Sequence, residues 1–117
     1  MTGRRRLLVV DDEAEIVELL RLTFEDFEVD TALDADSALA RLRVGTFDAL
    51  ITDVRMPGRS GLTLIDHAVE LSPGIVVIVI TGHHQEFGSD RRVARWIPKP
   101  FSISGIRATL LHELGLT

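Results

Sequence analysis

The sequence predicts an α/β fold in which a five-stranded parallel sheet is covered by helices on both faces. Apolar runs typical of buried strands alternate with segments of helical periodicity, and short loops join them into five βα units. The composition agrees, because 117 residues with 45% hydrophobic and 26% charged side chains suffice for one hydrophobic core. We expect a single domain over residues 1–117.

Three of the expected strands are apolar without alternation, as strands covered on both faces should be. They are residues 7–10, residues 47–53 with an apolar run at 49–51, and residues 75–80, which are six β-branched residues. Residues 28–33 alternate like an edge strand, and residues 93–97 are a weaker strand. The order of these segments predicts that helices fill the intervals between them.

The expected helices show apolar spacing and capping residues. The first helix, residues 13–24, collects its apolar side chains on one face: Ile16, Leu19, Leu20 and Phe24. Asp34 or Asp36 can cap a second helix, Ser60 a third, and Ser102 opens the last one. Each strand is thereby followed by a return helix, except that the interval after residue 80 has a weak pattern.

Polar side chains follow the apolar runs at the point where each strand ends: Asp11, Asp12, Asp53, Thr81 and Lys99. Because parallel strands end at one edge of the sheet, where ligands bind in open α/β folds, we expect these groups to converge. Adjacent carboxylates suit a hard divalent cation, Mg²⁺ or Ca²⁺, although acids there could also cap the next helix. Asp53 can act as a nucleophile. A metal, a hydroxyl and an ammonium beside it could hold the oxygens of a phosphoryl group, which indicates an acyl phosphate on Asp53.

The remaining composition excludes several classes of function. The net charge of −5 argues against a general nucleic-acid surface. The absence of cysteine excludes disulfides and thiolate metal sites, and no apolar run approaches the length of a membrane span. A cytoplasmic protein is expected. The adjacent His83 and His84 are interpreted as solvated loop residues rather than a zinc site.

Five short motifs occur in order along nearly the whole chain: VVDDE at 9–13, DVRMP at 53–57, Gly61, TG at 81–82 and KPF at 99–101. Together they resemble the receiver domain of two-component response regulators. The resemblance implies a flavodoxin-like, doubly wound (βα)5 fold. It also implies a phosphorylation-activated switch that accepts a phosphoryl group from a phosphohistidine donor, a sensor histidine kinase or a histidine phosphotransfer protein. Such a domain catalyses its own phosphoryl transfer and autodephosphorylation without being a turnover enzyme.

The same resemblance implies a role for each site residue. Asp53 would be the phosphoacceptor. Asp12 would bind Mg²⁺ directly, Asp11 through water, and Asp53 and the carbonyl of Arg55 would complete the metal ligands. The output would be a contact with a downstream protein target, without direct binding of nucleic acid or membrane.

The switch residues are also implied by the resemblance. Lys99 would pair with the phosphoryl group and Thr81 would move toward it. Trp96 stands where the family keeps an aromatic side chain that rotates with the switch, although a core role is the alternative. The peptide bond between Lys99 and Pro100 is expected to be cis.

Two departures from the family pattern lead to further expectations. The interval from Thr81 to Lys99 is short, and residues 83–92 contain Phe87 as the only large apolar residue, so the fourth helix should be short, irregular or missing. A dimer through the usual face would then be in doubt. Arg55 and His83 follow Asp53 and Thr81 by two positions, and we expect them to slow autodephosphorylation.

Two rival functions remain at this point. A phosphatase with an aspartate nucleophile usually has a second acid two residues later, where this chain has Arg55. A degenerate receiver that acts only as a phosphorylation-independent interaction module is the other. The chain ends at Thr117 without an output domain, so its output is expected to be a protein contact or onward phosphoryl transfer, unless it is a piece of a transcription factor or a hybrid kinase.

Overall fold

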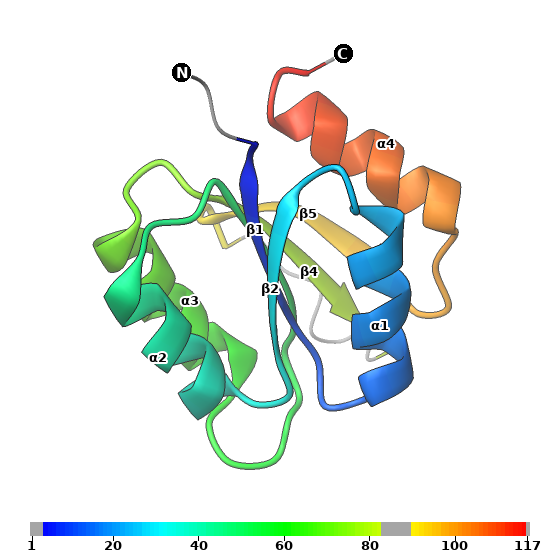
Figure 1. The fold of residues 1–117 in the computed structure, drawn as a ribbon. Helices are drawn as coiled ribbons and strands as arrows, with labels where there is room; N and C mark the ends of the chain where they lie inside the picture. Colours follow the sequence, from blue (N-terminus) through cyan, green and yellow to red (C-terminus); the bar gives the residue numbers. More distant parts are fainter. Residues whose placement is uncertain (1–3, 83–89, 117) are drawn as a thin grey trace.

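The computed structural model describes residues 4–82 and 90–116 and has five parallel strands in one sheet. The strand order is β2-β1-β3-β4-β5, and every neighbouring pair is parallel. The strands are β1 (Arg6–Val10), β2 (Glu28–Ala32), β3 (Ala49–Asp53), β4 (Val76–Thr81) and β5 (Val93–Pro98). The predicted doubly wound α/β fold is confirmed (Figure 1).

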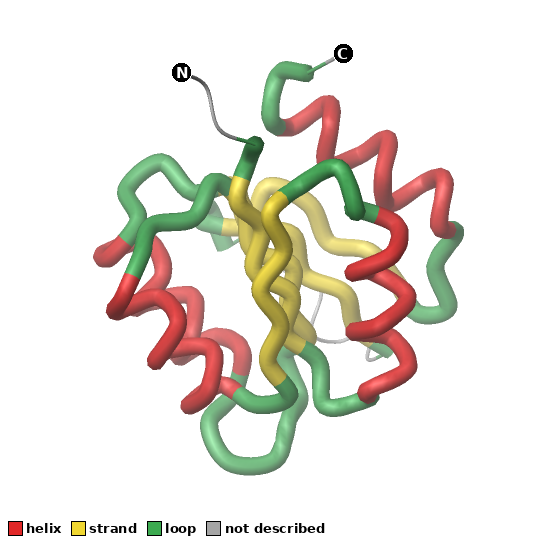
Figure 2. Tube along the Cα trace, viewed as in Figure 1, coloured by secondary structure: helices red, strands yellow, loops and turns green. Residues whose placement is uncertain are grey.

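The helices form two layers, one on each side of the sheet (Figure 2). The described helices are α1 (Ala14–Thr23), α2 (Ala35–Val44), α3 (Gly61–Leu71) and α4 (Ile103–Glu113). Helices α1 and α4 pack on one face, and α2 and α3 pack together on the other. Right-handed crossovers explain this division, because the chain winds away from β1 in one direction and then in the other.

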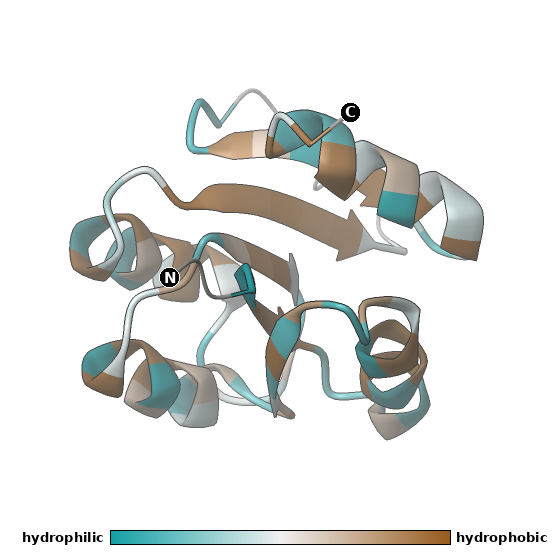
Figure 3. Ribbon diagram, turned by 45° about the horizontal axis from the view of Figure 1, so that its top comes forward, coloured by the Kyte–Doolittle hydropathy of each residue, from teal (hydrophilic) through white to brown (hydrophobic). Residues whose placement is uncertain are grey.

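The central strand β1 shows why the apolar runs do not alternate. Leu7 and Val9 belong to the core beneath α1 and α4, whereas Leu8 and Val10 belong to the core beneath α2 and α3. All four side chains are fully buried. Figure 3 shows the matching pattern in β4, which is hydrophobic along nearly its whole length. A strand with both faces covered has no place for a polar side chain until it ends.

Short polar side chains begin three of the helices. Asp34, rather than Asp36, accepts a hydrogen bond from the N–H of Ser37 at 2.7 Å. Ser60 and Ser102 do the same for α3 and α4. Helix α1 begins at Ala14, and Glu13 at its N-cap makes no side-chain capping hydrogen bond.

Helix α1 differs from the prediction in the face that it buries. Val17 is buried and Leu19 is 37% exposed, although Leu19 was expected to face inward. The buried stripe is centred on Val17, Leu20 and Phe24, with Ile16 and Leu19 at its edge. Apolar residues spaced three or four apart occur both on the face that contains Leu19 and on the face that contains Val17. The sequence pattern therefore did not determine which of these residues lies at the centre of the buried stripe.

The helix expected between residues 81 and 93 would fall in the interval between β4 and β5. Residues 83–89 lie outside those described, so the expectation of a short, irregular or missing helix stays a prediction. Asp90 and Arg92 precede β5, and Arg92 forms ion pairs with both Asp90 and Asp66 of α3. This contact joins the start of β5 to the α2–α3 layer. No helix in residues 4–82 or 90–116 has both the length and the apolar character needed to cross a membrane.

Candidate functional site

The carboxyl ends of the strands bring the predicted site residues together. Asp11 follows β1, Asp53 and Thr81 are the last residues of β3 and β4, and Lys99 follows β5. Thr81 is 1% exposed, and its carbonyl accepts a hydrogen bond from the N–H of Lys99 at 3.0 Å. The predicted convergence is therefore present in the structure.

Three carboxylates form the centre of the site. One ligand oxygen each from Asp11, Asp12 and Asp53 lies within 4.8 Å of the others. Asp11 is fully buried and Asp53 is 6% exposed, whereas Asp12 is open to solvent. The set therefore combines two desolvated acids with one that solvent can reach.

Backbone donors hold the two buried acids in place. The N–H of Glu13 donates to Oδ1 of Asp11 at 2.8 Å, and the N–H of Arg55 donates to Oδ1 of Asp53 at 3.2 Å. Burial raises the pKa of Asp11 and outweighs the opposing effects of the Glu13 hydrogen bond and the Lys99 charge. The carbonyl of Arg55 as a metal ligand stays a prediction.

Lys99 neutralises part of this negative charge. Its Nζ lies 2.7 Å from Oδ2 of Asp53, 2.9 Å from Oδ2 of Asp11 and 2.8 Å from Oε2 of Glu13. Burial by itself would lower the pKa of Lys99, but the hydrogen bonds to Asp53 and Glu13 and the ion pair with Asp11 outweigh it and raise that pKa. The ammonium is thus fixed in its charged form beside Asp53.

The donor set fits a hard divalent cation. Oδ2 of Asp11 is buried and, among the described residues, accepts no hydrogen bond, since its contact with Lys99 is an ion pair without hydrogen-bond geometry. The Lys99 ammonium brings one positive charge to this buried oxygen but no hydrogen bond, so a metal ion could still coordinate it. Oxygen ligands with several negative charges are those that Mg²⁺ and Ca²⁺ prefer.

Gly61 packs directly against the end of β3. A Cβ built on Gly61 would collide with the backbone carbonyl of Asp53 and would lie 3.0 Å from Cα of Val54. The N–H of Gly61 donates to the carbonyl of Val54 at 2.8 Å. The sequence marked Gly61 as part of a motif, and the structure shows that α3 begins too close to Asp53 for any side chain.

Trp96 and the loop after β5 complete the predicted set. Trp96 pairs with Val79 in the sheet register and is partly buried against the core beneath α2 and α3. Its role in a switch stays a prediction. The peptide bond between Lys99 and Pro100 is cis, as expected. His83 and His84 lie outside the described residues.

One residue of the site was missed by the sequence reasoning. Glu13 was interpreted as one of three acids that end the first strand or cap the next helix, and its contact with Lys99 was not foreseen. The two residues are 86 positions apart. The available signal was that Glu13 follows Asp11 and Asp12 at the same sheet edge.

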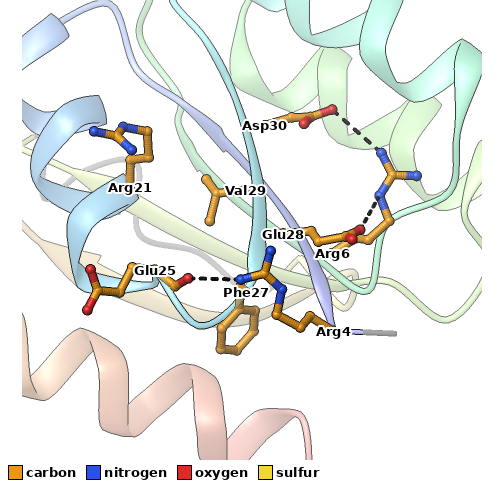
Figure 4. A pocket seen from close by; sticks show the side chains of 8 residues that line it. All are labelled: Arg4, Arg6, Arg21, Glu25, Phe27, Glu28, Val29 and Asp30. Carbon is orange, nitrogen blue, oxygen red and sulfur yellow. Dashed lines mark hydrogen bonds and ion pairs between the residues drawn. The ribbon is translucent and has the colours of Figure 1, made fainter. Parts of the chain in front are cut away.

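A hollow separate from the acidic cluster lies along the edge strand β2, between Arg4, Arg6 and Arg21, and has a volume of about 520 Å³ (Figure 4). Its three arginines already have partners, and Arg21 pairs with Glu18. Arg4 donates to the carbonyl of Glu25 at 3.3 Å, and Arg6 pairs with Glu28 and Asp30 at 3.8 and 3.6 Å. The hollow therefore lacks the unsatisfied polar atom that distinguishes the acidic cluster.

The fold and the site together define a small α/β domain that presents an acidic cluster and a fixed ammonium at one sheet edge. The family model described as the response regulator receiver domain matches residues 7–111. The chain therefore belongs to the response regulator receiver domain family, whose general function is a phosphorylation switch in two-component systems.

Individual relatives agree with this assignment. The transcriptional regulatory protein DltR of Streptococcus agalactiae is 32% identical over 111 residues, which are 90% of this chain and 50% of DltR. The chain thus spans about half the length of the curated relatives it matches. Receiver domains of response regulators interact with histidine kinases and with downstream effectors.

Solved structures show the same fold. The CheY-like receiver domain protein from Methanospirillum hungatei has a TM-score of 0.84 and 25% identity, covering 97% of this chain and 95% of that one. The response regulator protein TrrA from Thermotoga maritima, in complex with Mg²⁺-BeF, has a TM-score of 0.81 and 30% identity. The matched region covers 93% of this chain and 98% of the TrrA chain.

Proposed function

We propose that this domain accepts a phosphoryl group from a phosphohistidine onto Asp53 and changes its interactions as a result. The observation that carries the proposal is the position of Asp53, whose Oδ2 lies 2.7 Å from the Lys99 ammonium within the cluster of Asp11 and Asp12. An oxygen nucleophile, a fixed positive charge and cation ligands are the groups that phosphoryl transfer requires.

The transfer step involves one bond formed and one bond broken. A carboxylate oxygen of Asp53 attacks phosphorus, the P–N bond to the donor histidine breaks, and the electron pair returns to the imidazole nitrogen. The N–H of Arg55 orients the carboxylate, and Lys99 stabilises the charge on the transferring oxygens. The hydroxyl of Thr81, at the end of the neighbouring strand, supplies a further donor once it turns toward the group.

Mg²⁺ is the proposed cofactor. Asp11, Asp12, Asp53 and the carbonyl of Arg55 would hold it, and the buried Oδ2 of Asp11 is the observation that favours a cation there. When bound, Mg²⁺ neutralises charge on the phosphoryl oxygens and orients them. The Mg²⁺-BeF complex of TrrA, a relative with 30% identity, supports the choice of metal.

The switch follows from the new charge on Asp53. A phosphoryl group adds acceptor oxygens that Thr81 and Lys99 can bind, so phosphorylation favours the arrangement in which both reach it. Trp96 is the proposed reporter of this change because it is partly buried in the strand next to Thr81. We propose no free turnover beyond self-phosphorylation and autodephosphorylation.

The proposed partners are a sensor histidine kinase or a histidine phosphotransfer protein as donor and a protein as target. Several relatives are named transcriptional regulatory proteins. We assign no nucleic-acid contact to this domain, because a net charge of −5 opposes binding to phosphates.

Intact mass after incubation with Mg²⁺ and acetyl phosphate tests the proposal. We expect one phosphoryl adduct that requires Mg²⁺ and is lost in Asp53→Asn. A domain that stays unmodified but still folds and binds Mg²⁺ would favour the alternative, a phosphorylation-independent interaction module. Sustained hydrolysis of a phosphoester substrate would favour a phosphatase.

A further inference from the structure

Glu13 reaches the phosphoryl site from the start of α1. Its Oε2 lies 2.8 Å from Nζ of Lys99, which is nearly the distance between that ammonium and Asp53. In residues 4–82 and 90–116, the carboxylates in ion-pairing contact with Lys99 are those of Asp11, Glu13 and Asp53. Glu13 is therefore a third acid at the group that is proposed to bind the phosphoryl oxygens.

Three carboxylates crowd the ammonium of Lys99. Its hydrogen bonds go to Glu13 and Asp53, and Oδ2 of Asp11 lies 2.9 Å away in an ion pair, so three acceptors surround a group that has three N–H donors. One of them has to leave before Lys99 can bind an oxygen of a phosphoryl group on Asp53. If none leaves, one N–H group of Lys99 has to be shared between a carboxylate and the phosphoryl oxygen, and both of these contacts are then weaker.

Exposure decides which carboxylate leaves. The side chain of Asp11 is fully buried, and that of Asp53 is 8% exposed and carries the incoming group. The side chain of Glu13 is 59% exposed. A carboxylate that is already largely hydrated loses little when it exchanges its ammonium partner for water, so Glu13 is the displaceable one.

We propose that Glu13 is a positioning residue that competes with the phosphoryl group for Lys99. It thereby slows phosphorylation of Asp53 and weakens binding of phosphoryl-like anions. The inference rests on the proposed function of Asp53 and adds that Glu13 limits how readily Asp53 is phosphorylated. Its negative charge also opposes the approach of an anionic phosphodonor to the site.

The side chain of Glu13 can be changed without disturbing the start of the helix. Its carboxylate makes no capping hydrogen bond to α1. The structural contacts come from the backbone: the N–H donates to Asp11, and the carbonyl accepts from the N–H groups of Ile16 and Val17. Substitution by glutamine therefore removes the charge and keeps these contacts.

Glu15 provides a matched control. It is an exposed acid in the first turn of the same helix, and it is not among the carboxylates that contact Lys99. Glu15→Gln removes the same charge from the same helix end, so it reproduces the effect on net charge and on the helix dipole. A difference between Glu13→Gln and Glu15→Gln then reports the contact with Lys99.

The first measurement is the rate of phosphorylation by phosphoramidate at fixed Mg²⁺, followed by intact mass. We expect Glu13→Gln to react about two- to five-fold faster than the wild type, which is the size of a partly exposed ion pair. Glu15→Gln should match the wild type. Glu13→Ala, which also removes the acceptor, should gain at least as much as Glu13→Gln.

The second measurement is the affinity for fluoroberyllate in the presence of Mg²⁺, obtained by calorimetry. Glu13→Gln should bind it about two- to five-fold tighter than both the wild type and Glu15→Gln. A Glu13→Gln that is no faster and no tighter than Glu15→Gln, or slower and weaker, would overturn the inference. A wild type that gains no phosphoryl adduct contradicts the proposed function instead, and the fluoroberyllate affinities still decide the role of Glu13.

Discussion

Gly61→Ala perturbs the site through the backbone of Asp53 and replaces no charged residue. The added Cβ would overlap the carbonyl of Asp53 and lie 3.0 Å from Cα of Val54. These are backbone atoms at the end of β3, which is paired with β4 as far as Asp53. The steric overlap can therefore be removed only if β3 or the start of α3 moves. We expect the variant to displace the Asp53 carboxylate from its position beside Lys99.

The free energy follows from two opposing effects. Overpacking costs about 1–3 kcal/mol, and the rigid backbone places this case toward the upper end. Alanine in a helix gains at most about 1 kcal/mol over glycine. The free energy of unfolding in urea should therefore fall by roughly 2 kcal/mol, the difference between these effects.

Gly82→Ala is the matched control for this prediction. A Cβ at Gly82 meets no atom of residues 4–82 or 90–116 within 4 Å, and the φ of Gly82 is not in the left-handed region. We expect its free energy of unfolding to stay within about 0.5 kcal/mol of the wild type. If Gly61→Ala proves as stable as Gly82→Ala, or more stable than the wild type, the close approach of α3 to Asp53 is refuted.

Three further predictions concern the cap of α2, the ammonium of the site and the contact before β5. Asp34→Ala should lower the free energy of unfolding by about 0.5–2 kcal/mol, because it leaves the N–H of Ser37 without its cap. Asp36→Ala, which loses only an exposed ion pair with Arg59, should cost about 0–1 kcal/mol in the same urea titration. Lys99→Met should lower the free energy of unfolding by about 2–4 kcal/mol, since two buried carboxylates lose their cation. Saturating Mg²⁺ should restore part of this lost stability, and EDTA should reverse that effect of Mg²⁺. Asp90→Asn should change the pH dependence of stability. Its hydrogen bonds with Arg92 lower the pKa of Asp90 to about 2, against about 3.9 in an unfolded chain. The stabilisation from a depressed folded-state pKa is fully present above the unfolded value and is lost as pH falls through the folded one, so the gap in melting temperature between wild type and variant should be full near pH 6 and mostly lost near pH 2. A gap that is the same at both pH values would contradict this assignment.

The apolar runs were sufficient to predict the sheet and the edge at which the site forms. Residues 7–10 and 75–80 are typical of strands buried on both faces, and most of each run lies in β1 or β4. The position of Asp11, Asp53, Thr81 and Lys99 at one edge follows from the parallel pairing of the strands that end there. The site was thus predictable because each side chain is fixed by the end of a strand.

The features that could not be predicted depend on contacts between distant residues. The pattern of α1 fits a stripe on Leu19 as well as one on Val17, and only packing on the sheet selects the second. The ion pair of Glu13 with Lys99 depends on the path of the loop after β5, which the sequence does not specify. The same holds for the approach of Gly61 to Asp53.

The most direct test of the account is to locate the phosphoryl group. Borohydride reduces an aspartyl phosphate to homoserine, which peptide mass mapping assigns to a single position. After incubation with Mg²⁺ and acetyl phosphate, the account predicts homoserine at Asp53 and unmodified aspartate at Asp11 and Asp12. Homoserine at Asp11 or Asp12 in place of Asp53 would contradict the proposed phosphoacceptor.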